Sequence, residues 1–293
     1  MSSRMVPGAL RRSAAAILVA TCSLAAVACA DDDARAVVAV GADSSTESVL
    51  LAEIYSQALS RTGTDTTVLT GLDTPTADLD AGRIAVLPAR NGSLLDRWNP
   101  SAAARAPEDV LAAVNAALPQ GLSVSDAADG TDLRPRLLVT EDFATRENLR
   151  TVAALTCPEL TAGYTELPGL APTAIGPDLV ADCAFAATSH YPDTEALRNA
   201  LRDGQIQVGI VNGPPTGENP ADLITLDDED YALRTQNILA LHRTGIFDRR
   251  QTKKLNYVAG ELTTEELIDL ITQVESGAAP AIVARTWLDD HGL

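Results

Sequence analysis

Short apolar runs alternate with stretches of helical periodicity along most of the chain. The first such unit begins with a continuous apolar run at 37–40, which predicts a buried parallel strand. A polar segment at 41–46 contains several residues that favour the N-cap of a helix, and apolar residues then recur at helical spacing between Leu50 and Leu59. Gly63 stands where a helix stop belongs. Because ligands of open α/β sheets bind where strands end and helices begin, we expect the segment at 41–46 to face a ligand.

The same alternation continues to the end of the chain. Further strands are predicted at 68–69, 84–87, 122–124, 137–139, 206–211, 223–226 and 238–241. Further helices are predicted at 94–98, 107–118, 142–148, 194–202, 263–274 and 280–288, with a short helical turn at 151–155. A turn is predicted at 74–80, a capping box at 263–266, and proline and glycine make 157–180 the most loop-like segment. This alternation predicts a mostly parallel α/β fold, and no internal repeat is visible.

The N-terminus has the pattern of a secretory signal. Arg4, Arg11 and Arg12 precede an uncharged run at 13–28 that is rich in Ala, Leu and Val. A basic start, a short apolar run and small residues near its end are typical of an export signal, and the run is too short and too weakly apolar for a permanent membrane span. We expect general export rather than twin-arginine export, because the residues that usually follow the arginine pair are missing.

Two cleavage sites fit the end of this signal. Ala26-Val27-Ala28-Cys29 resembles the lipoprotein box of bacteria, in which the cysteine becomes the lipidated first residue. Ala28-Cys29-Ala30 also fits the small-x-small pattern of an ordinary signal peptidase. We favour the lipoprotein alternative, which makes 1–29 a signal peptide with a lipobox and 30–35 an acidic tether. The protein would then be attached to the membrane through a lipid on Cys29.

Composition and charge narrow the classes of function. The chain has 293 residues, of which 46% are hydrophobic, so it can bury a sizeable core. Its net charge is −18, and removal of the signal, which carries three arginines and no acidic residue, brings the net charge near −21. Nucleic-acid binding requires a basic face, so we expect no nucleic-acid partner, and the acidity itself indicates no more than solubility.

Two of the four cysteines are expected to form a disulfide. Cys22 leaves with the signal and Cys29 is the proposed lipid attachment site, so Cys157 and Cys183 remain. An even pair in an exported protein indicates a disulfide, here across the most loop-like segment, and a bridge of this span stabilises a protein by about 3 kcal/mol. No histidine or further cysteine stands at ligand spacing from either residue, which argues against a zinc site.

Catalytic and cofactor motifs are missing from the sequence. His190, His242 and His291 are far apart along the chain and belong to no nucleophile motif. There is no Gly-x-Ser-x-Gly, Walker or dinucleotide-binding pattern, and the acidic run at 227–230 lacks the spacing of a calcium loop. We therefore expect a protein that is not an enzyme and that has no metal and no cofactor.

The C-terminal stretch carries the most specific pattern. Residues 262–267 (Leu-Thr-Thr-Glu-Glu-Leu), the pair Gln273-Val274 and residues 283–293 (Val-Ala-Arg-Thr-Trp-Leu-Asp-Asp-His-Gly-Leu) resemble the C-terminus of the quaternary-amine solute-binding proteins of ABC importers. These are the OpuAC-type proteins for glycine betaine, choline and carnitine. Blocks at 40–47, 51–59, 81–95, 200–209 and 226–228 resemble the same family in the same order.

This resemblance implies an α/β, two-lobed periplasmic-binding-protein fold of type II, with the ligand cleft between the lobes. It places lobe 1 at 36–135 and lobe 2 at 136–234. Residues 235–293 would return to lobe 1 and supply the C-terminal helices.

The aromatic cage of the family is the point at which the sequence departs from it. A methylated cation is held by ring faces, since it offers no N–H for hydrogen bonds. The resemblance places Ser45 at a phenylalanine of the family, and Ala89 and Arg90 at a Glu-Tyr pair. An arginine there suits a carboxylate or phosphate better than a quaternary cation. Tyr191 is the best remaining cage residue, with an ordinary half-buried tyrosine as the alternative, and the alternative for Arg90 is a solvated surface arginine.

We expect a solute-binding protein outside the cytoplasm that passes a small polar solute to the subunits of an ABC permease. The solute would be like betaine or choline, or a related amine or carboxylate, and the protein a monomer on the outer face of the cell membrane. The alternative is a relative without a ligand, which acts as an envelope sensor or interaction lipoprotein. The expected ligand-binding residues are Ser44, Ser45, Thr46, Arg90, Asn91 and Ser93 from lobe 1, and Tyr191 and Asn212 from lobe 2.

Overall fold

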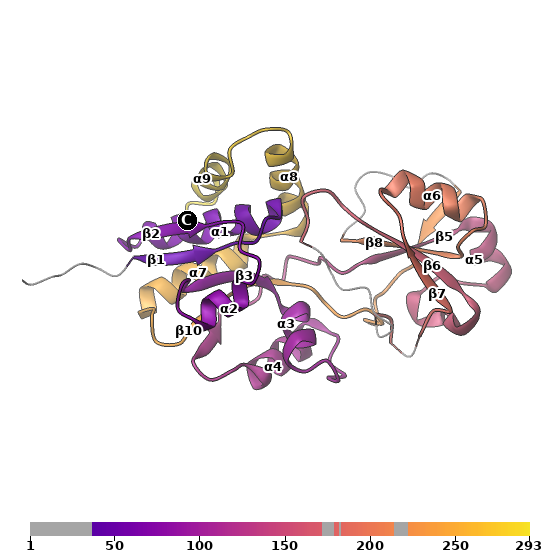
Figure 1. Ribbon diagram of the computed structural model, residues 1–293, viewed down its shortest axis with the longest axis horizontal. Coiled ribbons are helices and arrows are strands. Elements are labelled where there is room, and N and C mark those ends of the chain that lie inside the picture. Colours follow the sequence, from indigo (N-terminus) through magenta and orange to yellow (C-terminus); the bar gives the residue numbers. More distant parts are fainter. Residues whose placement is uncertain (1–36, 172–178, 182, 214–221) are drawn as a thin grey trace, which may run out of the picture. The chain divides into compact units, whose positions relative to one another are not determined.

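The computed structural model of the protein describes residues 37–171, 179–181, 183–213 and 222–293, which form two five-stranded sheets flanked by helices (Figure 1). The predicted signal at 1–29, the tether at 30–35 and the lipid attachment residue Cys29 lie outside these described residues. None of the helices within the described ranges has both the length and the apolar character that a membrane span requires.

The first sheet has the strand order β2-β1-β3-β10-β4. Its strands are β1 (Val38–Gly41), β2 (Thr66–Leu69), β3 (Val86–Arg90), β4 (Leu122–Val124) and β10 (Ile238–Arg243). β1 pairs in parallel with β2 and β3, whereas β10 runs antiparallel to both β3 and β4. The apolar run predicted as the first strand therefore lies inside this sheet, between β2 and β3.

The second sheet repeats this arrangement in the order β7-β6-β8-β5-β9. Its strands are β5 (Arg136–Thr140), β6 (Thr161–Glu166), β7 (Ala187–His190), β8 (Val208–Asn212) and β9 (Leu223–Thr225). β6 pairs in parallel with β7 and β8, and β5 runs antiparallel to β8 and β9.

The prediction of a mostly parallel fold is wrong, because half of the neighbouring strand pairs in each sheet are antiparallel. The antiparallel strand is in each case the one by which the chain enters from the other sheet: β5 follows β4, and β10 follows β9. The spacing of strands and helices along a sequence does not reveal the direction in which such a strand enters. The sequence pattern therefore indicates the elements and leaves their relative direction open.

Helix α1 is covered by helices from the C-terminal end of the chain (Figure 1). The helices are α1 (Thr46–Ser60), α2 (Pro75–Asp80), α3 (Asn91–Trp98), α4 (Pro107–Ala117), α5 (Glu141–Glu147), α6 (Thr194–Arg202), α7 (Arg249–Glu261), α8 (Thr264–Glu275) and α9 (Pro280–Asp290). α1 packs against α7, α8 and α9, and its side chains Leu50, Ile54 and Tyr55 are fully buried. This packing holds the start of α1 in place for the site described below.

Several elements differ from the prediction. Residues 75–80 form α2 rather than a turn, since Pro75 occupies a first-turn position that tolerates proline. β6 lies inside the segment predicted as loop, and α7 was not predicted. The capping box is found at the start of α7, between Asp248 and Gln251. At 263–266 the Thr263 hydroxyl oxygen accepts from the Glu266 amide, but the Glu266 carboxylate accepts from that hydroxyl instead of the Thr263 amide.

The predicted disulfide between Cys157 and Cys183 is present, with the two Cα atoms 5.1 Å apart. Both cysteines are buried in a core that also contains Leu137, Val139 and Ile210. The bridge therefore fixes the segment before β6 and the segment before β7 to the same face of the second sheet.

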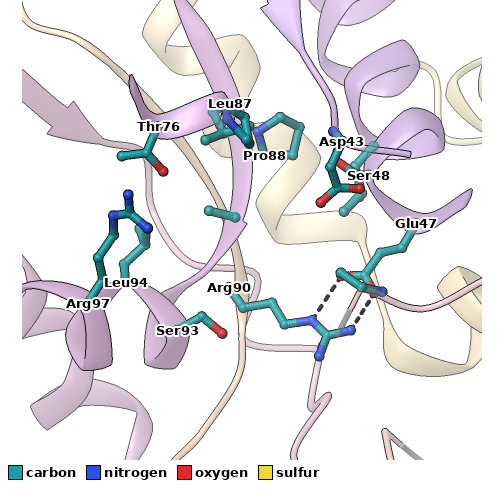
Figure 2. Close-up of a pocket in the computed structure, with 14 residues that line it drawn as sticks. Asp43, Glu47, Ser48, Thr76, Leu87, Pro88, Arg90, Ser93, Leu94 and Arg97 are labelled. Carbon is teal, nitrogen blue, oxygen red and sulfur yellow. Dashed lines mark hydrogen bonds and ion pairs between the residues drawn. The ribbon is translucent and has the colours of Figure 1, made fainter. Parts of the chain in front are cut away.

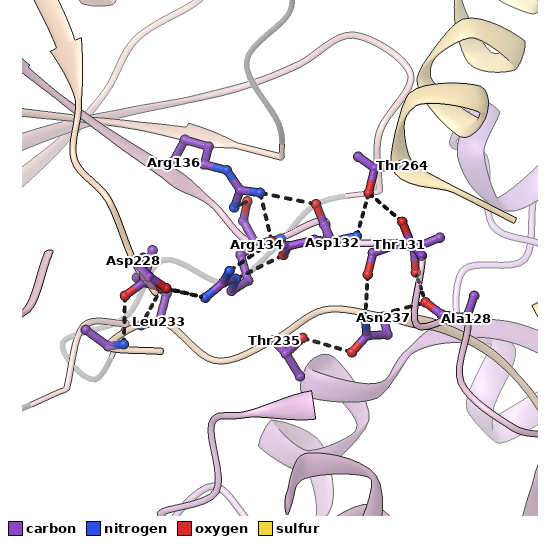
Figure 3. A network of polar contacts seen from close by, with 12 residues as sticks. Ala128, Thr131, Asp132, Arg134, Arg136, Asp228, Leu233, Thr235, Asn237 and Thr264 are labelled. Atoms are coloured by element: carbon purple, nitrogen blue, oxygen red, sulfur yellow. Dashed lines mark hydrogen bonds and ion pairs between the residues drawn. The ribbon is translucent and has the colours of Figure 1, made fainter. Parts of the chain in front are cut away.

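A polar network ties together the two chain segments that connect the sheets (Figure 3). Arg134 and Arg136 each lie 2.9 Å from the Asp132 carboxylate, and Arg134 also pairs with Asp228 at 2.7 Å. Burial raises the pKa of Asp132, but the hydrogen bonds and charges of the two arginines outweigh it, so that this pKa lies below its usual value. At Asp228 burial prevails and raises the pKa, although the Leu233 amide and Arg134 oppose the change.

Candidate functional site

A cavity of about 210 Å³ lies where α1 begins and β3 ends (Figure 2). Its wall is built from α1, β3, α2 and α3. It is lined by Asp43, Glu47, Ser48, Leu51, Pro75, Thr76, Leu87, Pro88, Ala89, Arg90, Ser93, Leu94, Arg97 and Ala171. The polar segment that the sequence predicts to face a ligand contributes Asp43 to this wall.

Hydrogen bonds at the start of α1 fix the position of Asp43. Its Oδ1 accepts from the Ser45 amide at 2.8 Å and from the Ser45 hydroxyl at 2.6 Å. Ser45 is the N-cap of α1 and accepts from the Ser48 amide at 3.2 Å, while the Asp43 amide donates to the Ser48 hydroxyl at 3.1 Å. Short polar side chains favour such local networks at helix starts. Asp43 Oδ2 is left without a hydrogen bond to any residue in the described ranges.

Glu47 and Arg90 form a buried ion pair on the cavity wall (Figure 2). Arg90 Nε donates to Glu47 Oε1 at 2.9 Å, and Arg90 Nη2 donates to Glu47 Oε2. The Arg90 side chain is 4% exposed and the Glu47 side chain 3% exposed. Because the two charges balance each other at close range, the pair contributes little net charge to the cavity.

The backbone at Ala171 links this ion pair to β8. The Ala171 amide donates to Glu47 Oε2 at 2.9 Å, and the Glu47 amide donates to the Gly169 carbonyl at 2.8 Å. Asn212, at the end of β8, donates from Nδ2 to the Ala171 carbonyl at 3.4 Å. A continuous series of polar contacts therefore runs from β3 through α1 to the second sheet. Asn212 Oδ1 is buried and has no hydrogen-bond partner among the residues that the structure describes.

The first turn of α3 is held against the segment 235–237, which precedes β10. Asn91 Oδ1 accepts from the Asn237 amide at 2.9 Å, and the Ser93 amide and hydroxyl donate to Gln236 Oε1 at 3.1 and 3.2 Å. A Cβ atom on Gly92 would lie 2.2 Å from the Thr235 carbonyl oxygen, so only glycine permits this close approach. Asn91 is fully buried and structural in these contacts, whereas Ser93 also lines the cavity.

Arg90 and Ser93 are therefore the predicted ligand residues that line this cavity. Ser44 is exposed, Ser45 caps α1, and the Thr46 hydroxyl donates to Glu275 of α8. Tyr191 is half-buried beside β6, where a Cβ atom on Gly163 would lie 2.5 Å from its ring. Asn91 and Asn212 lie behind the wall in the contacts described above. The ligand-binding roles of these residues stay predictions.

Five polar residues of the cavity were not predicted as ligand residues: Asp43, Glu47, Ser48, Thr76 and Arg97. Asp43 stands in the segment predicted to face a ligand, where it was one of several candidate N-cap residues. Glu47 is in the first turn of the same helix, where an acidic residue is commonly explained by its favourable interaction with the helix dipole alone. Thr76 and Arg97 carried no signal, because their approach to the cavity depends on how α2 and α3 pack.

The cavity wall contains no aromatic residue among the described residues that line it. Figure 2 shows Asp43 and Arg97 on opposite sides of the cavity, with Leu87 and Pro88 between them. Arg97 is exposed and makes no hydrogen bond or ion pair with the described part of the chain. No cluster of His, Cys, Asp and Glu in the described ranges has a geometry that could hold a metal ion.

A larger hollow, of about 1230 Å³, lies between the segment 100–106 and the segments 179–181, 183–184 and 230–236. Many of the side chains around it are small and apolar. Arg105 donates to the Ala232 carbonyl at 3.0 Å, and Arg234 donates to the Ala104 carbonyl at 3.0 Å. Both arginines are thus engaged with backbone carbonyls, and the wall of this hollow also contains Asp96, Asp109, Asp230, Tyr231 and Gln236. The smaller cavity adjoins the polar segment that the sequence predicts to face a ligand, and for this reason it is taken as the candidate binding site.

Comparison with known proteins agrees with this fold. The sequence model of a family described as the substrate binding domain of the ABC-type glycine betaine transport system matches residues 36–290. The structure is similar to that of a glycine betaine/carnitine/choline ABC transporter, with 17% identity, a TM-score of 0.62, and coverage of 87% of this chain and 98% of that chain. It is also similar to apo YehZ from Escherichia coli, with 16% identity, a TM-score of 0.59, and coverage of 87% and 98%. No curated protein matches the sequence. The predicted two-lobed periplasmic-binding-protein fold is confirmed.

Proposed function

The chain belongs to the family of substrate-binding domains of ABC-type glycine betaine transport systems, and from this premise we propose that it is the exported solute-binding lipoprotein of an ABC importer. It captures a small polar solute and delivers it to the permease as a monomer on the outer face of the cell membrane. The observation that carries the proposal is the family match, which extends over nearly all of the chain after residue 36.

The cavity at the start of α1 supports this proposal. It lies beside β3 and is in contact with Ala171, which is hydrogen-bonded to Asn212 of the second sheet. A solute in the cavity would therefore affect groups that belong to both sheets. Two-lobed binding proteins close around a ligand by a hinge motion, and the connecting segments with Asp132, Arg134 and Asp228 are the natural place for such a hinge.

Native mass spectrometry of the protein purified from its own host is the most direct test, because the mass of the complex reveals a retained solute of any chemical class. A thermal-shift screen of betaines, choline, amino acids and organic anions is the complement. A compound at 100 times its dissociation constant should stabilise the protein by about 2.7 kcal/mol. The importer function fails if the native spectrum shows no bound solute and none of these compounds raises the melting temperature.

The lipid anchor requires a separate test. Growth with labelled palmitate should label the wild-type protein and leave Cys29→Ser unlabelled. Replacement of Cys22, which would leave with the signal, is the matched control and should not affect labelling. An unlabelled wild-type protein would favour ordinary cleavage near Ala28 and release of a soluble form.

A second function is favoured by the composition of the cavity wall. The resemblance to the family implies a quaternary ammonium held by aromatic rings, and it places Arg90, which is paired with Glu47, at the position of a tyrosine. The chain would then be a relative that has no transported solute and acts as an envelope sensor or interaction lipoprotein. Co-purification of ABC permease subunits with the protein supports the importer, and a protein that binds neither permease nor solute supports the relative without a ligand.

A further inference from the structure

The charges that line the cavity fall into two groups. Glu47 and Arg90 neutralise each other within a buried bidentate pair, which leaves Asp43 and Arg97 as the remaining charged groups of the wall. One is an acceptor and the other a donor. The cavity therefore presents one negative and one positive group to a ligand, beyond a pair that is already satisfied internally.

Asp43 is held ready to accept a hydrogen bond. Its Oδ1 is fixed by the amide and hydroxyl of Ser45, at 2.8 and 2.6 Å, and Oδ2 has no partner in the described part of the chain. An aspartate that is oriented by its own helix cap does not have to be reorganised when a cation binds. The pairing of Arg90 with Glu47 also removes the repulsion that an uncompensated arginine would exert on such a cation.

Arg97 supplies the opposite group. It projects from α3 on the other side of the cavity from Asp43, beside Thr76 (Figure 2). It is exposed, and no carboxylate in the described ranges pairs with it. A guanidinium presents a fork of N–H donors that fits a carboxylate with two hydrogen bonds.

The chemical type of the ligand's ammonium group, quaternary or with N–H groups, follows from the lack of aromatic residues among the described residues of the cavity wall. A quaternary ammonium has no N–H and is attracted by ring faces, and none of the described residues lining the cavity is aromatic. A primary or secondary ammonium has N–H groups that a carboxylate accepts in charge-assisted hydrogen bonds. We propose that the cavity binds a small zwitterion whose ammonium carries N–H groups, with Asp43 as the partner of the ammonium and Arg97 as the partner of the ligand carboxylate. This substrate class rests on the proposed function as a solute-binding protein.

Pairs of compounds that differ only in N-methylation test this inference. The pairs are glycine and glycine betaine, β-alanine and β-alanine betaine, and γ-aminobutyrate and γ-butyrobetaine, which also vary the spacing between the two charges. Isothermal titration of the full exported chain should give, in at least one pair, a free amine that binds about tenfold or more tightly than its trimethylated form, because methylation removes every hydrogen bond to Asp43.

Single-residue variants test which side chain binds the ammonium of the ligand and which binds its carboxylate. Asp43→Asn keeps the Oδ1 acceptor for Ser45 and should weaken binding of the amine by about tenfold or more, and so should Arg97→Gln. Asp126→Asn and Arg146→Gln are the matched controls, since both residues are exposed and outside the cavity wall. Their affinities should equal that of the wild type. Circular dichroism and melting temperature of each variant establish that it is folded.

The outcomes separate this inference from the function on which it rests. Tighter binding of the trimethylated member in every pair overturns the inference and leaves the solute-binding function intact. Equal loss of affinity in the control variants removes Asp43 and Arg97 from the site. If no member of any pair binds, the inference fails, and the function fails with it only if the native mass spectrum and the wider screen also show no solute.

Discussion

The carboxylate of Glu47 and the guanidinium of Arg90 form a bidentate ion pair whose side chains are 3% and 4% exposed. The same carboxylate accepts the Ala171 amide at 2.9 Å. One acidic residue in the first turn of α1 thus fixes an arginine at the end of β3 and a backbone segment that leads to the second sheet. The pair is part of the framework of the cavity, and this explains how an arginine charge can be buried in its wall.

Removal of one partner of this pair should be strongly destabilising. Glu47→Gln removes the carboxylate that forms a bidentate pair with the buried Arg90, and we expect a loss of about 3–5 kcal/mol in the free energy of unfolding. The measurement is urea denaturation followed by circular dichroism. The double variant Glu47→Gln/Arg90→Met removes both charges and should recover much of the loss. Arg202→Ala, which breaks the exposed pair with Asp222, is the control and should leave the midpoint nearly unchanged.

Asp132 should contribute to stability in a pH-dependent way. The arginines beside it lower its pKa in the folded protein, so its contribution is present above the pKa of the unfolded chain, near 4, and is lost as the pH falls through the folded value. Asp132→Asn should therefore be less stable than the wild type at pH 7, with the difference shrinking toward zero as the pH falls below about 4. Chemical denaturation of both proteins at several pH values measures this difference. A difference that stays constant over that range would contradict the assignment.

The contribution of Asp228 to stability should depend on pH in the opposite direction from that of Asp132. Burial raises its pKa in the folded protein, so the protonated form is favoured there, and stability from this group is lost as the pH rises through the folded value. Asp228 accepts from the Ala232 amide at 2.7 Å and from the Leu233 amide at 3.2 Å, contacts that an asparagine can keep only in part. We therefore expect the stability of Asp228→Asn to approach that of the wild type as the pH rises, and the same denaturation series tests it.

The disulfide should stabilise the folded chain by about 3 kcal/mol, because it closes a loop between residues that are 26 positions apart. The variant Cys157→Ser/Cys183→Ser should show this loss in urea denaturation under oxidising conditions. The reduced wild type should behave like the double variant, and mass analysis without reductant should show two fewer hydrogens in the oxidised wild type. Equal stability of the oxidised and reduced wild type would show that the bridge adds nothing to the fold.

Gly92 should not accept a larger side chain. A Cβ atom there would lie 2.2 Å from the Thr235 carbonyl oxygen and 2.6 Å from Gln236 Nε2, so Gly92→Ala must displace the segment 235–237 from α3. We expect a loss of about 1–3 kcal/mol and a weaker ligand response, since Ser93 depends on the same contact. Gly260→Ala is the matched control: Gly260 lies in α7 with open space around it, and alanine there should be neutral or stabilise by up to about 1 kcal/mol.

The sequence predicted well those features that are encoded locally. The strand, polar segment and helix at the start of the chain are present as β1 and α1, because apolar periodicity and cap residues act over a few positions. α7 was missed although Asp248 and Gln251 form its capping box, since the basic residues that follow obscure the apolar stripe of Leu255, Val258 and Ala259. β6 was missed because proline and glycine around it resemble a loop.

The chemistry of the site depends on contacts between distant parts of the sequence. Arg90 could be assigned to a binding position from the resemblance, but its partner is 43 residues away, and no spacing rule connects the two. Arg97 reaches the cavity through the packing of α3, and Asn91 is occupied by Asn237. The contact between Asn91 and Asn237 arises only when β10 is placed beside β3, which the order of elements along the chain does not specify.

The shared strand order also determines when each half of the molecule can be completed during synthesis. Strands β5 to β9 follow one another along the chain, so the second sheet is complete once residue 225 has been made. The first sheet must wait for β10, which separates β3 from β4 and is made only after the whole second sheet. The sheet that begins first is therefore finished last, and a chain interrupted before residue 238 would carry a complete second sheet and a first sheet with an open β3 edge.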